Sequence, residues 1–416
     1  MSADTSAAGI VIIGAGQAGV MTAEALRTGG FEGPITLLGN EPHGPYHRPP
    51  LSKAWMAGEI EAAQLVMRAP EMLARKNITL RTGVTVKAID RSAQTVVLGD
   101  GSALPYTGLV LATGSTPRAL PLPGSDAPGV LALRTRDDAS AIADRLAACI
   151  AQQRPVVVIG GGFIGLEVAA TARKKGLAVT VLEAAPRLLG RVLAPVLSDW
   201  YAELHRGHGV QLLLGAQVAA IETDADGAVS GVKLADGSVV PAGLVVVGIG
   251  VSANDQLAQA AGLACDRGIV VDACCRTSDP LIVAAGDCTA RRLADGNLLR
   301  LESVQNATEQ GKSAAAALLG QERPFTATPW FWSDQYDKKL QMAGLSMGAD
   351  GWAVRGDMAA GAFTVYHFKG EQLIAADSVN ASKDHLLVRK LLDAGVSPTR
   401  EQAGDVAFDL ASLLVK

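Results

Sequence analysis

Two glycine-rich runs in the chain have the spacing of a turn that holds a pyrophosphate. They read IVIIGAGQAG and VVVIGGGFIG, and their glycines are Gly14, Gly16 and Gly19 in the first run and Gly160, Gly162 and Gly165 in the second. In such a run the first glycine permits a tight turn, the second lets the backbone approach the phosphates, and the third lets a helix pack closely on a strand. The chemistry that this spacing predicts is the binding of two dinucleotides.

The elements around each run agree with that prediction. A four-residue β-branched strand precedes each run, and a helical segment follows it, VMTAEALRTGG in the first copy and LEVAATARKKG in the second. A second strand then follows, ITLL at 35–38 and VTVLE at 179–183. An isolated glycine run is also common in ordinary turns, but strand–turn–helix context in both copies favours two βαβ dinucleotide units.

The residue at the end of the second strand selects between dinucleotides. Glu183 lies 21 residues after Gly162, where an acid accepts hydrogen bonds from the ribose hydroxyls and repels a 2′-phosphate. The second unit is therefore predicted to prefer NADH to NADPH. In the first unit Gly39 and Asn40 stand in this region, so the usual acid is missing or displaced.

Two further segments, LVLATG at 109–114 and LVVVGIG at 244–250, read as single strands that follow turn-rich hairpins and complete each unit. A third strand, LIVAAGD, ends in Asp287, which can hold a ligand hydroxyl or simply cap a turn. Near Thr328 aromatic and alternating segments begin, and they indicate a third, α+β domain. We therefore predict an α/β fold with two Rossmann-like dinucleotide-binding domains, one discontinuous (1–118 and 244–325) and one inserted (119–243), followed by an α+β domain at 326–416.

Composition and charge narrow the class of protein. The chain has 416 residues, 49% of them hydrophobic and 19% charged, and its 46 glycines are about 11% against a usual value of roughly 7%. The formal net charge of −4 argues against nucleic acid or an anionic membrane surface as the main partner. Five cysteines are too few for a disulfide framework, no basic leader precedes the first strand, and no apolar run is long enough for a membrane span, so we expect a cytoplasmic protein.

Several segments together resemble those of the FAD-dependent, NADH-using ferredoxin reductases of bacterial oxygenase and cytochrome P450 systems, and the chain is similar to rubredoxin reductases as well. The resemblance runs over essentially the whole chain. The segments that carry it are PYHRPPLSK (45–53), LVLATGSTPR (109–118), VVVIGGGFIGLEVAA (156–170), VLEAAPRLLGRV (181–192), TSDPLIVAAGDC (277–288), LESVQNATEQG (301–311) and FWSDQYD (331–337).

The resemblance implies a glutathione-reductase-like fold in which a discontinuous FAD domain surrounds an NADH domain and a C-terminal domain helps to bind the partner. It implies these cofactor-binding residues: Gly14, Ala15, Gly16, Ala18, Gly19, Asn40, Arg48, Lys53, Val86, Ala112, Thr113, Gly114, Arg134, Gly160, Gly162, Phe163, Ile164, Gly165, Glu183, Arg191, Gly248, Ile249, Gly250, Asp287, Val304 and Trp332. Among them Asn40 would face the adenosine ribose, Val86 the adenine, Asp287 the ribityl chain and Val304 the pyrimidine ring. Asn40 departs from the acid that the family often has there.

The same resemblance places Arg48, Lys53 and Arg134 toward the flavin. It implies that Lys53 and Glu167 form the catalytic pair that orients the nicotinamide and the flavin. For Glu167 the alternative is an ordinary solvated position on a helix surface. Trp332 is a candidate for the flavin edge, and its alternative is core packing.

The resemblance implies one reaction. NADH delivers two electrons as hydride, FAD accepts them, and a small two-iron ferredoxin takes them one at a time to an oxygenase or a cytochrome P450. No metal is predicted, and the chain is expected to be a monomer or a weak dimer. Among short basic groups, Arg291-Arg292 and Lys338-Lys339 are the favoured contacts for an acidic ferredoxin.

Other functions stay open on the sequence. A rubredoxin or a monodehydroascorbate-type reductase would differ only in the acceptor, and an NADH-binding redox sensor similar to the apoptosis-inducing factors would share the cofactors. A disulfide oxidoreductase needs a cysteine pair after the first glycine run, but the first cysteine is Cys149. The adjacent Cys274 and Cys275 could form a strained disulfide, although ordinary packing is favoured.

Overall fold

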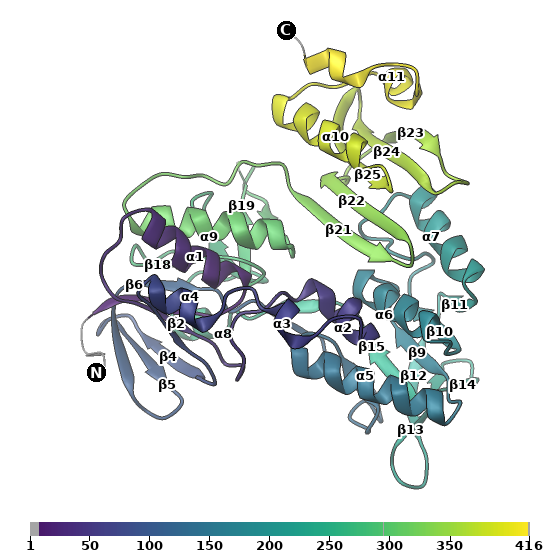
Figure 1. Cartoon of the computed structure of the whole chain (residues 1–416), viewed down its shortest axis with the longest axis horizontal. Helices are drawn as coiled ribbons and strands as arrows, with labels where there is room; N and C mark the ends of the chain where they lie inside the picture. The colour runs from purple at the N-terminus through teal and green to yellow at the C-terminus, as the bar shows by residue number, and fades with distance from the viewer. Residues whose placement is uncertain (1–7, 294, 415–416) are drawn as a thin grey trace. The chain divides into compact units, whose positions relative to one another are not determined.

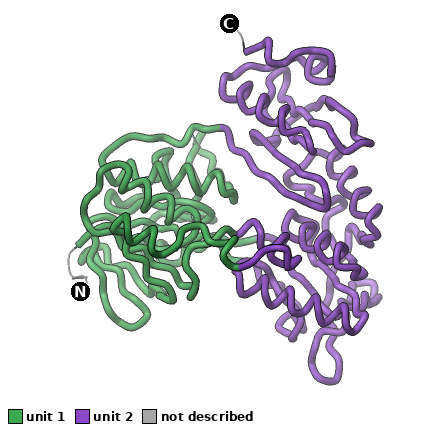
Figure 2. The backbone as a smooth tube through the Cα atoms, in the orientation of Figure 1, with its two compact units in different colours: residues 1–47, 62–116, 251–327 green, residues 48–61, 117–250, 328–416 purple. Residues whose placement is uncertain are grey.

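The chain folds into two compact units, each built from three separate stretches of sequence (Figure 2). The structure is a computed structural model that describes residues 8–293 and 295–414. Unit 1 comprises residues 1–47, 62–116 and 251–327, and unit 2 comprises residues 48–61, 117–250 and 328–416. Within the described ranges, no helix is both long enough and apolar enough to cross a membrane.

Unit 1 is organised around a parallel sheet whose central strand runs into the first glycine run. Its parallel strands are β1 (Gly9–Ile13), β2 (Ile35–Leu38), β3 (Ile78–Arg81), β6 (Ala103–Leu111) and β18 (Ile282–Ala284). They lie in the order β3-β2-β1-β6, with β18 also paired to β6. Strands β4 (Val86–Asp90) and β5 (Thr95–Leu98) extend β6 in antiparallel fashion.

Both faces of this sheet are covered, which explains the unbroken apolar sequence of β1. Helices α1 (Gln17–Thr28) and α9 (Val304–Leu318) lie side by side on one face (Figure 1). There they pack against Ile10 and Ile12. Val11 and Ile13 point to the opposite face, as the two-residue period of a strand requires, and join a second core. The shorter elements of unit 1 are α3 (Ala62–Leu65), α4 (Pro70–Arg75), β7 (Ser115–Pro117), β16 (Val251–Ala253), α8 (Gln256–Ala260), β17 (Ile269–Val271), β19 (Thr289–Arg292) and β20 (Leu298–Leu299).

Unit 2 contains a second parallel sheet with the same plan. Its strands are β8 (Val130–Ala132), β9 (Val156–Ile159), β10 (Val179–Glu183), β11 (Val210–Leu214) and β15 (Leu244–Val247), in the order β11-β10-β9-β15-β8. The accompanying elements are α5 (Arg136–Ala151), α6 (Phe163–Lys174), α7 (Pro195–Gly207), β12 (Val218–Thr223), β13 (Val229–Leu234) and β14 (Val239–Pro241). In both sheets the strand before the glycine run lies between the next strand of the βαβ unit and a returning strand. This confirms the predicted repeat and the Rossmann-like class.

The C-terminal part of unit 2 is an antiparallel sheet with helices, the predicted α+β domain. Its elements are β21 (Trp330–Gln335), β22 (Lys338–Gly344), β23 (Gly351–Asp357), β24 (Ala362–Lys369), β25 (Gln372–Val379), α10 (Ser382–Ala394), α11 (Arg400–Gly404) and η2 (Leu410–Leu414). Strand order is β21-β22-β25-β24-β23. Buried Leu340 and Phe363 of this sheet share one core with Leu197 and Tyr201 of α7. Residues 328–416 therefore form one compact unit with 117–250.

The boundaries of the units differ most from the predicted ones at two places. Strand β15 pairs with β9, and the stretch that returns to unit 1 begins at Val251, whereas the predicted boundary lies at 244. The segment Arg48–Glu61 belongs to unit 2, although the sequence prediction placed it in the first domain. Both differences arise from tertiary packing, because neither a strand's sheet partner nor a loop's contact surface is encoded in local periodicity.

Candidate functional site

At the first glycine of each run the chain turns out of its strand. This turn lies close to the end of the returning strand of the same sheet. Gly14 has a φ of +113° and Gly160 a φ of +110°, a backbone conformation that side chains disfavour. A Cβ atom at Gly14 would lie 2.1 Å from the carbonyl oxygen of Ala112, and one at Gly160 would lie 2.4 Å from that of Gly248. The structure thus brings two of the predicted cofactor residues, Ala112 and Gly248, to the glycine turns.

The other glycines leave a cradle at the start of each helix. A Cβ at Gly19 would lie 1.9 Å from the oxygen of Gly14, so this glycine allows close helix packing. A Cβ at Gly16 would meet no protein atom within 4 Å, and one at Gly162 would meet only the Gly248 oxygen at 4.0 Å. Helices α1 and α6 begin directly after Gly16 and Gly162, with no side-chain cap at either. Open space before uncapped helix N-termini fits the pyrophosphate of a dinucleotide in both units.

Glu183 lies beside the second cradle, at the end of β10. Its carboxylate accepts hydrogen bonds from the backbone amides of Gly161 at 2.6 Å and Ala185 at 2.7 Å, so its position is fixed. The nearest downstream arginine, Arg187, donates to the carbonyl oxygens of Leu193 and Gly190. Because the Arg187 guanidinium is hydrogen-bonded to these backbone carbonyl groups, it does not pair with Glu183. The charge at the end of β10 is therefore the negative charge of Glu183.

Lys53 and Glu167 form a close ion pair in unit 2. The Lys53 Nζ atom lies 2.6 Å from Oε2 of Glu167, whose side chain is 2% exposed, whereas that of Lys53 is 21% exposed. Lys53 follows the short helix η1 (Pro49–Ser52), whose two prolines favour its first turn, and precedes α2 (Ala54–Ala57). Glu167 lies in the second turn of α6. The alternative of a solvated helix surface is wrong for Glu167, because this carboxylate is buried.

Two serines complete the surroundings of that carboxylate. Ser52 donates to Oε2 of Glu167 at 2.5 Å, and Ser333 of β21 donates to Oε1 at 2.6 Å. With Lys53, three donors converge on one buried carboxylate, which is the condition under which a buried charge is stable. The arrangement holds a lysine ammonium in one place while part of its surface stays accessible. Sequence reasoning missed both serines, since a serine carries no motif beyond its place in PPLS or FWSD.

Two further predicted residues of unit 1, Thr113 and Asp287, follow the carboxyl ends of parallel strands. Asp287 follows β18 and accepts a hydrogen bond from Ser115 at 3.0 Å. Thr113 follows β6, and its hydroxyl donates to the carbonyl of Asn254 at 2.5 Å. Val304 is the first residue of α9, which Ser303 caps. Ligands of open α/β sheets bind at this carboxyl edge, and the roles predicted for Thr113 and Asp287 there stay predictions.

In unit 2 the structure brings Arg48 and Arg134 together, because Nη1 of Arg48 donates to the carbonyl oxygen of Arg134 at 2.8 Å. Trp332 of β21 is partly buried, and its ring centroid lies 5.5 Å from that of Trp330. Phe163, at the start of α6, has its ring 4.8 Å from that of Phe331. Aromatic side chains therefore gather on β21 beside the start of α6.

A model of a known family describes most of this chain. The family described as pyridine nucleotide-disulphide oxidoreductase matches residues 8–311. The chain belongs to this family. A second model, described as reductase C-terminal, matches residues 330–414. Membership implies FAD and NAD(H) as cofactors, and the two cradles fit them.

Curated relatives and solved structures agree with the family. Rhodocoxin reductase of Rhodococcus erythropolis is 48% identical, over 96% of this chain and 93% of that protein. Putidaredoxin reductase of Pseudomonas putida is also 48% identical, over 97% and 96%. The crystal structure of a covalent putidaredoxin reductase–putidaredoxin complex superposes with a TM-score of 0.94 at 43% identity and covers 98% of both chains.

Four of the five cysteines of this family member are buried, and Cys265 is half-buried. All five, Cys149, Cys265, Cys274, Cys275 and Cys288, are free thiols. Burial raises the pKa of the Cys275 and Cys288 thiols, which disfavours the reactive thiolate form. Cys288 also lies 3.4 Å from the carbonyl oxygen of Leu111, inside the core. The adjacent Cys274 and Cys275 are therefore packed thiols, as favoured above.

The basic residues favoured as partner contacts differ in exposure. Arg291 of this oxidoreductase is half-buried, donates to the carbonyl oxygen of Phe325 at 2.5 Å and lies over the Phe325 ring at 4.6 Å. Its guanidinium therefore interacts with groups inside unit 1. Lys338 is paired with Asp337 at 2.7 Å, whereas Arg292 and Lys339 are exposed.

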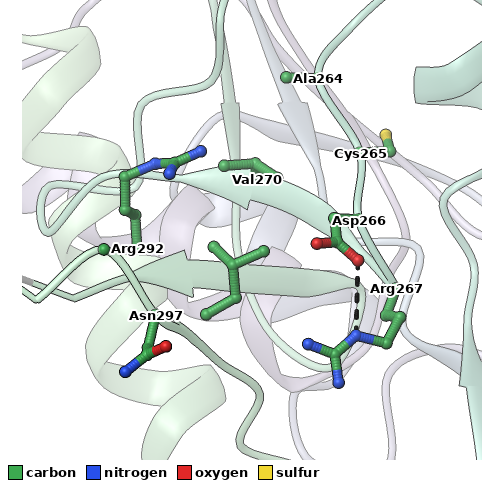
Figure 3. A pocket seen from close by; sticks show the side chains of 9 residues that line it. Ala264, Cys265, Asp266, Arg267, Val270, Arg292 and Asn297 are labelled. Carbon is green, nitrogen blue, oxygen red and sulfur yellow. Dashed lines mark hydrogen bonds and ion pairs between the residues drawn. The ribbon is translucent and has the colours of Figure 1, made fainter.

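A pocket that the sequence did not predict lies in unit 1 (Figure 3). Its volume is about 460 Å³, and residues 264–267, Val270, Arg292 and 296–298 line it. Arg267 approaches Asp266 at 3.4 Å, so one of its two arginines is partly neutralised. None of the predicted cofactor residues lines this pocket. Among the described residues, no three His, Cys, Asp or Glu side chains are grouped as a metal site would require.

Proposed function

We propose that the protein is an NADH-dependent, FAD-containing ferredoxin reductase that passes electrons one at a time to a small two-iron ferredoxin. The observation that carries the proposal is the pair of open glycine cradles, each on its own Rossmann-like sheet, with the Lys53–Glu167 pair beside the second of them. The names of the relatives, rhodocoxin reductase and putidaredoxin reductase, support the acceptor class. A ferredoxin of this kind would feed an oxygenase or a cytochrome P450.

Each glycine cradle is assigned one of the two dinucleotides. We assign FAD to unit 1, NADH to the parallel sheet of residues 117–250, and a partner-binding role to the domain from Thr328. In unit 1 the backbone around Gly16 would hold the FAD pyrophosphate, and Asp287 would hold a ribityl hydroxyl. In unit 2 Gly162 would hold the NADH pyrophosphate, and Glu183 its adenosine ribose.

FAD, when bound, converts the two-electron chemistry of NADH into single-electron transfer. The chain's own contribution is to hold the reactants in position. Glu167 fixes the ammonium of Lys53 on one side of the start of α6, and we assign to Lys53 the orientation of the nicotinamide. Fixing that ring in a reactive geometry removes much of the entropic cost of hydride transfer.

Anaerobic stopped-flow absorbance of the FAD-loaded protein tests this function. Rapid bleaching of the flavin band by NADH, followed by cytochrome c reduction that requires an added two-iron ferredoxin, is the expected result. Bleaching with no onward transfer to ferredoxin would contradict the reductase assignment. In that case rubredoxin and monodehydroascorbate should be tried as acceptors, and a long-lived NADH complex would favour a redox sensor.

Glu183→Ala should weaken the preference for NADH. The carboxylate is fixed at the end of β10, where it can accept from ribose hydroxyls, and a charge-assisted hydrogen bond contributes about 1.5–3 kcal/mol, so we expect the NADH:NADPH ratio of kcat/KM to fall roughly 10- to 100-fold. Steady-state kinetics with both nucleotides measures the ratio. Glu203→Ala, which removes an exposed acid on α7, is the matched control. An unchanged ratio for Glu183→Ala would show that another group sets the specificity.

Reduction of the ferredoxin should slow as salt is added. Arg292 and Lys339 are exposed, and small ferredoxins are commonly acidic, so association should be steered by charge. We expect the second-order rate for ferredoxin to fall about 10-fold between 0.01 M and 0.5 M salt, since the screening length drops below about 10 Å in this range. Cytochrome c-coupled assays at saturating NADH measure it. A flat salt response would exclude a charge-steered partner.

A further inference from the structure

A chain of hydrogen bonds continues from Glu167 into the interior of unit 2. Beyond Ser333, the amide nitrogen of Gln335 lies 3.2 Å from the serine hydroxyl, and Oε1 of Gln335 lies 2.8 Å from Nε2 of His205. Nδ1 of His205 lies 3.2 Å from the hydroxyl of Tyr336. Ser333, Gln335 and His205 are each at most 1% exposed. Three elements distant in sequence, α6, α7 and β21, are thus joined by a single polar path.

The chemistry of the side chains gives this path one direction. The Glu167 carboxylate, paired with an ammonium, only accepts hydrogen bonds, so the Ser333 hydroxyl must donate to it. The serine oxygen then accepts from the amide nitrogen of Gln335, which leaves Oε1 of Gln335 as an acceptor toward His205. His205 must therefore carry its proton on Nε2, and its Nδ1 accepts from Tyr336. Every donor along the path points toward the carboxylate.

The protonation state of His205 agrees with this direction of the hydrogen bonds. Burial lowers the pKa of His205 to about 4, so the imidazole is neutral near pH 7. A neutral imidazole has one donor and one acceptor nitrogen, which is what Gln335 and Tyr336 require. Tyr336 in turn stacks on the exposed ring of His208, with centroids 3.6 Å apart. The path therefore begins near the surface and ends at the ion pair.

We infer that His205 is a positioning residue for hydride transfer. Through Gln335 and Ser333 it fixes Oε1 of Glu167, and Glu167 in turn fixes the ammonium of Lys53. This inference rests on the proposed role of Lys53 in orienting the nicotinamide. A proton relay is not the role of the path, because the amide of Gln335 neither takes up nor releases a proton under ordinary conditions. The path instead fixes the orientation of the Glu167 carboxylate.

Three replacements of His205 separate positioning from simple packing. A glutamine places its amide nitrogen about where Nε2 lies, whereas an asparagine places it about where Nδ1 lies, and a leucine supplies no donor. We therefore expect His205→Gln to keep the limiting rate of flavin reduction within about 3-fold, and His205→Asn and His205→Leu to slow it about 10-fold, because small misplacements of a reactive group cost factors of this order or more. Stopped-flow at saturating NADH gives the rate, and Glu203→Gln, which changes an exposed residue of α7 outside the path, is the control that should not change it.

Two further measurements decide the interpretation. In a Lys53→Met background, His205→Asn should cause no further loss, since a group that acts through Lys53 has nothing left to position. Ser333→Ala, which leaves α7 intact, should slow reduction as His205→Asn does. Equal rates for His205→Gln and His205→Asn, or a full effect of His205→Asn without Lys53, would overturn the inference. A wild-type protein that NADH fails to reduce would instead overturn the proposed function, and with it this inference.

Discussion

Gly16→Ala should give a folded protein that has lost most of its affinity for FAD, and Gly162→Ala a folded, FAD-containing protein that binds NADH poorly. A Cβ at Gly16 meets no protein atom within 4 Å, and at Gly162 only one oxygen at 4.0 Å, so the protein itself has room for the methyl group. The methyl group instead fills space that the dinucleotide needs. Overpacking of this kind costs about 1–3 kcal/mol, which weakens binding roughly 10- to 100-fold.

The two variants are measured separately and control each other. Flavin absorbance after gel filtration reports FAD retention, and a titration with NADH monitored by flavin bleaching reports the second site. Gly207→Ala is the neutral comparison, because a Cβ there also meets nothing within 4 Å and no cradle is near it in α7. If Gly16→Ala retained FAD and Gly162→Ala lost it, the assignment of the two cradles would be reversed.

Glu167→Gln should slow flavin reduction by NADH about 100-fold, the order of loss expected when a reactive group is misplaced by about 1 Å. The replacement keeps the size of the side chain but removes the negative charge that holds Lys53. It also puts an amide nitrogen, a donor, against Ser52 or Ser333, both of which donate to the carboxylate. The Lys53 ammonium then loses its fixed position.

Stopped-flow absorbance at saturating NADH gives the rate, and the NADH concentration dependence separates it from binding. Glu24→Gln is the matched control, because Glu24 also carries two basic partners, Arg68 and Lys76, but lies in unit 1 on α1. We expect that control to reduce at the wild-type rate. A Glu167→Gln protein that reduces within 2-fold of wild type would remove the ion pair from the hydride step.

Local signals made the dinucleotide units predictable. Each glycine run is preceded by a fully buried strand, β1 or β9, whose apolar sequence can be read directly, and the positive φ of Gly14 and Gly160 is what the spacing implies. The strand ends that the sequence singled out, including Glu183 and Asp287, lie where parallel strands end in each sheet. The roles assigned to these residues toward FAD and NADH stay predictions.

The rest depended on packing that no local pattern encodes. Ser333 and His205 are 128 residues apart in the chain, and only the folded unit shows that they belong to one hydrogen-bonded path. The pairing of β15 with β9, which places this strand in unit 2 although the predicted boundary lies at 244, is likewise seen only in the folded sheet. Arg291 reads as a surface charge until the Phe325 ring is seen against it.

The discontinuity of the two units has a consequence for synthesis on the ribosome. Domains generally fold as units while the chain emerges at about 5–20 residues per second, but unit 1 lacks α9 until residue 318 has been made, and unit 2 lacks β21 until residue 335. Until the C-terminal sheet arrives, Glu167 has only the partners that residues 52 and 53 provide, and Trp200 of α7 lacks the Phe363 ring against which it packs. We expect the nascent chain to remain protease-sensitive through most of its translation and to become resistant late, as the C-terminal sheet is released.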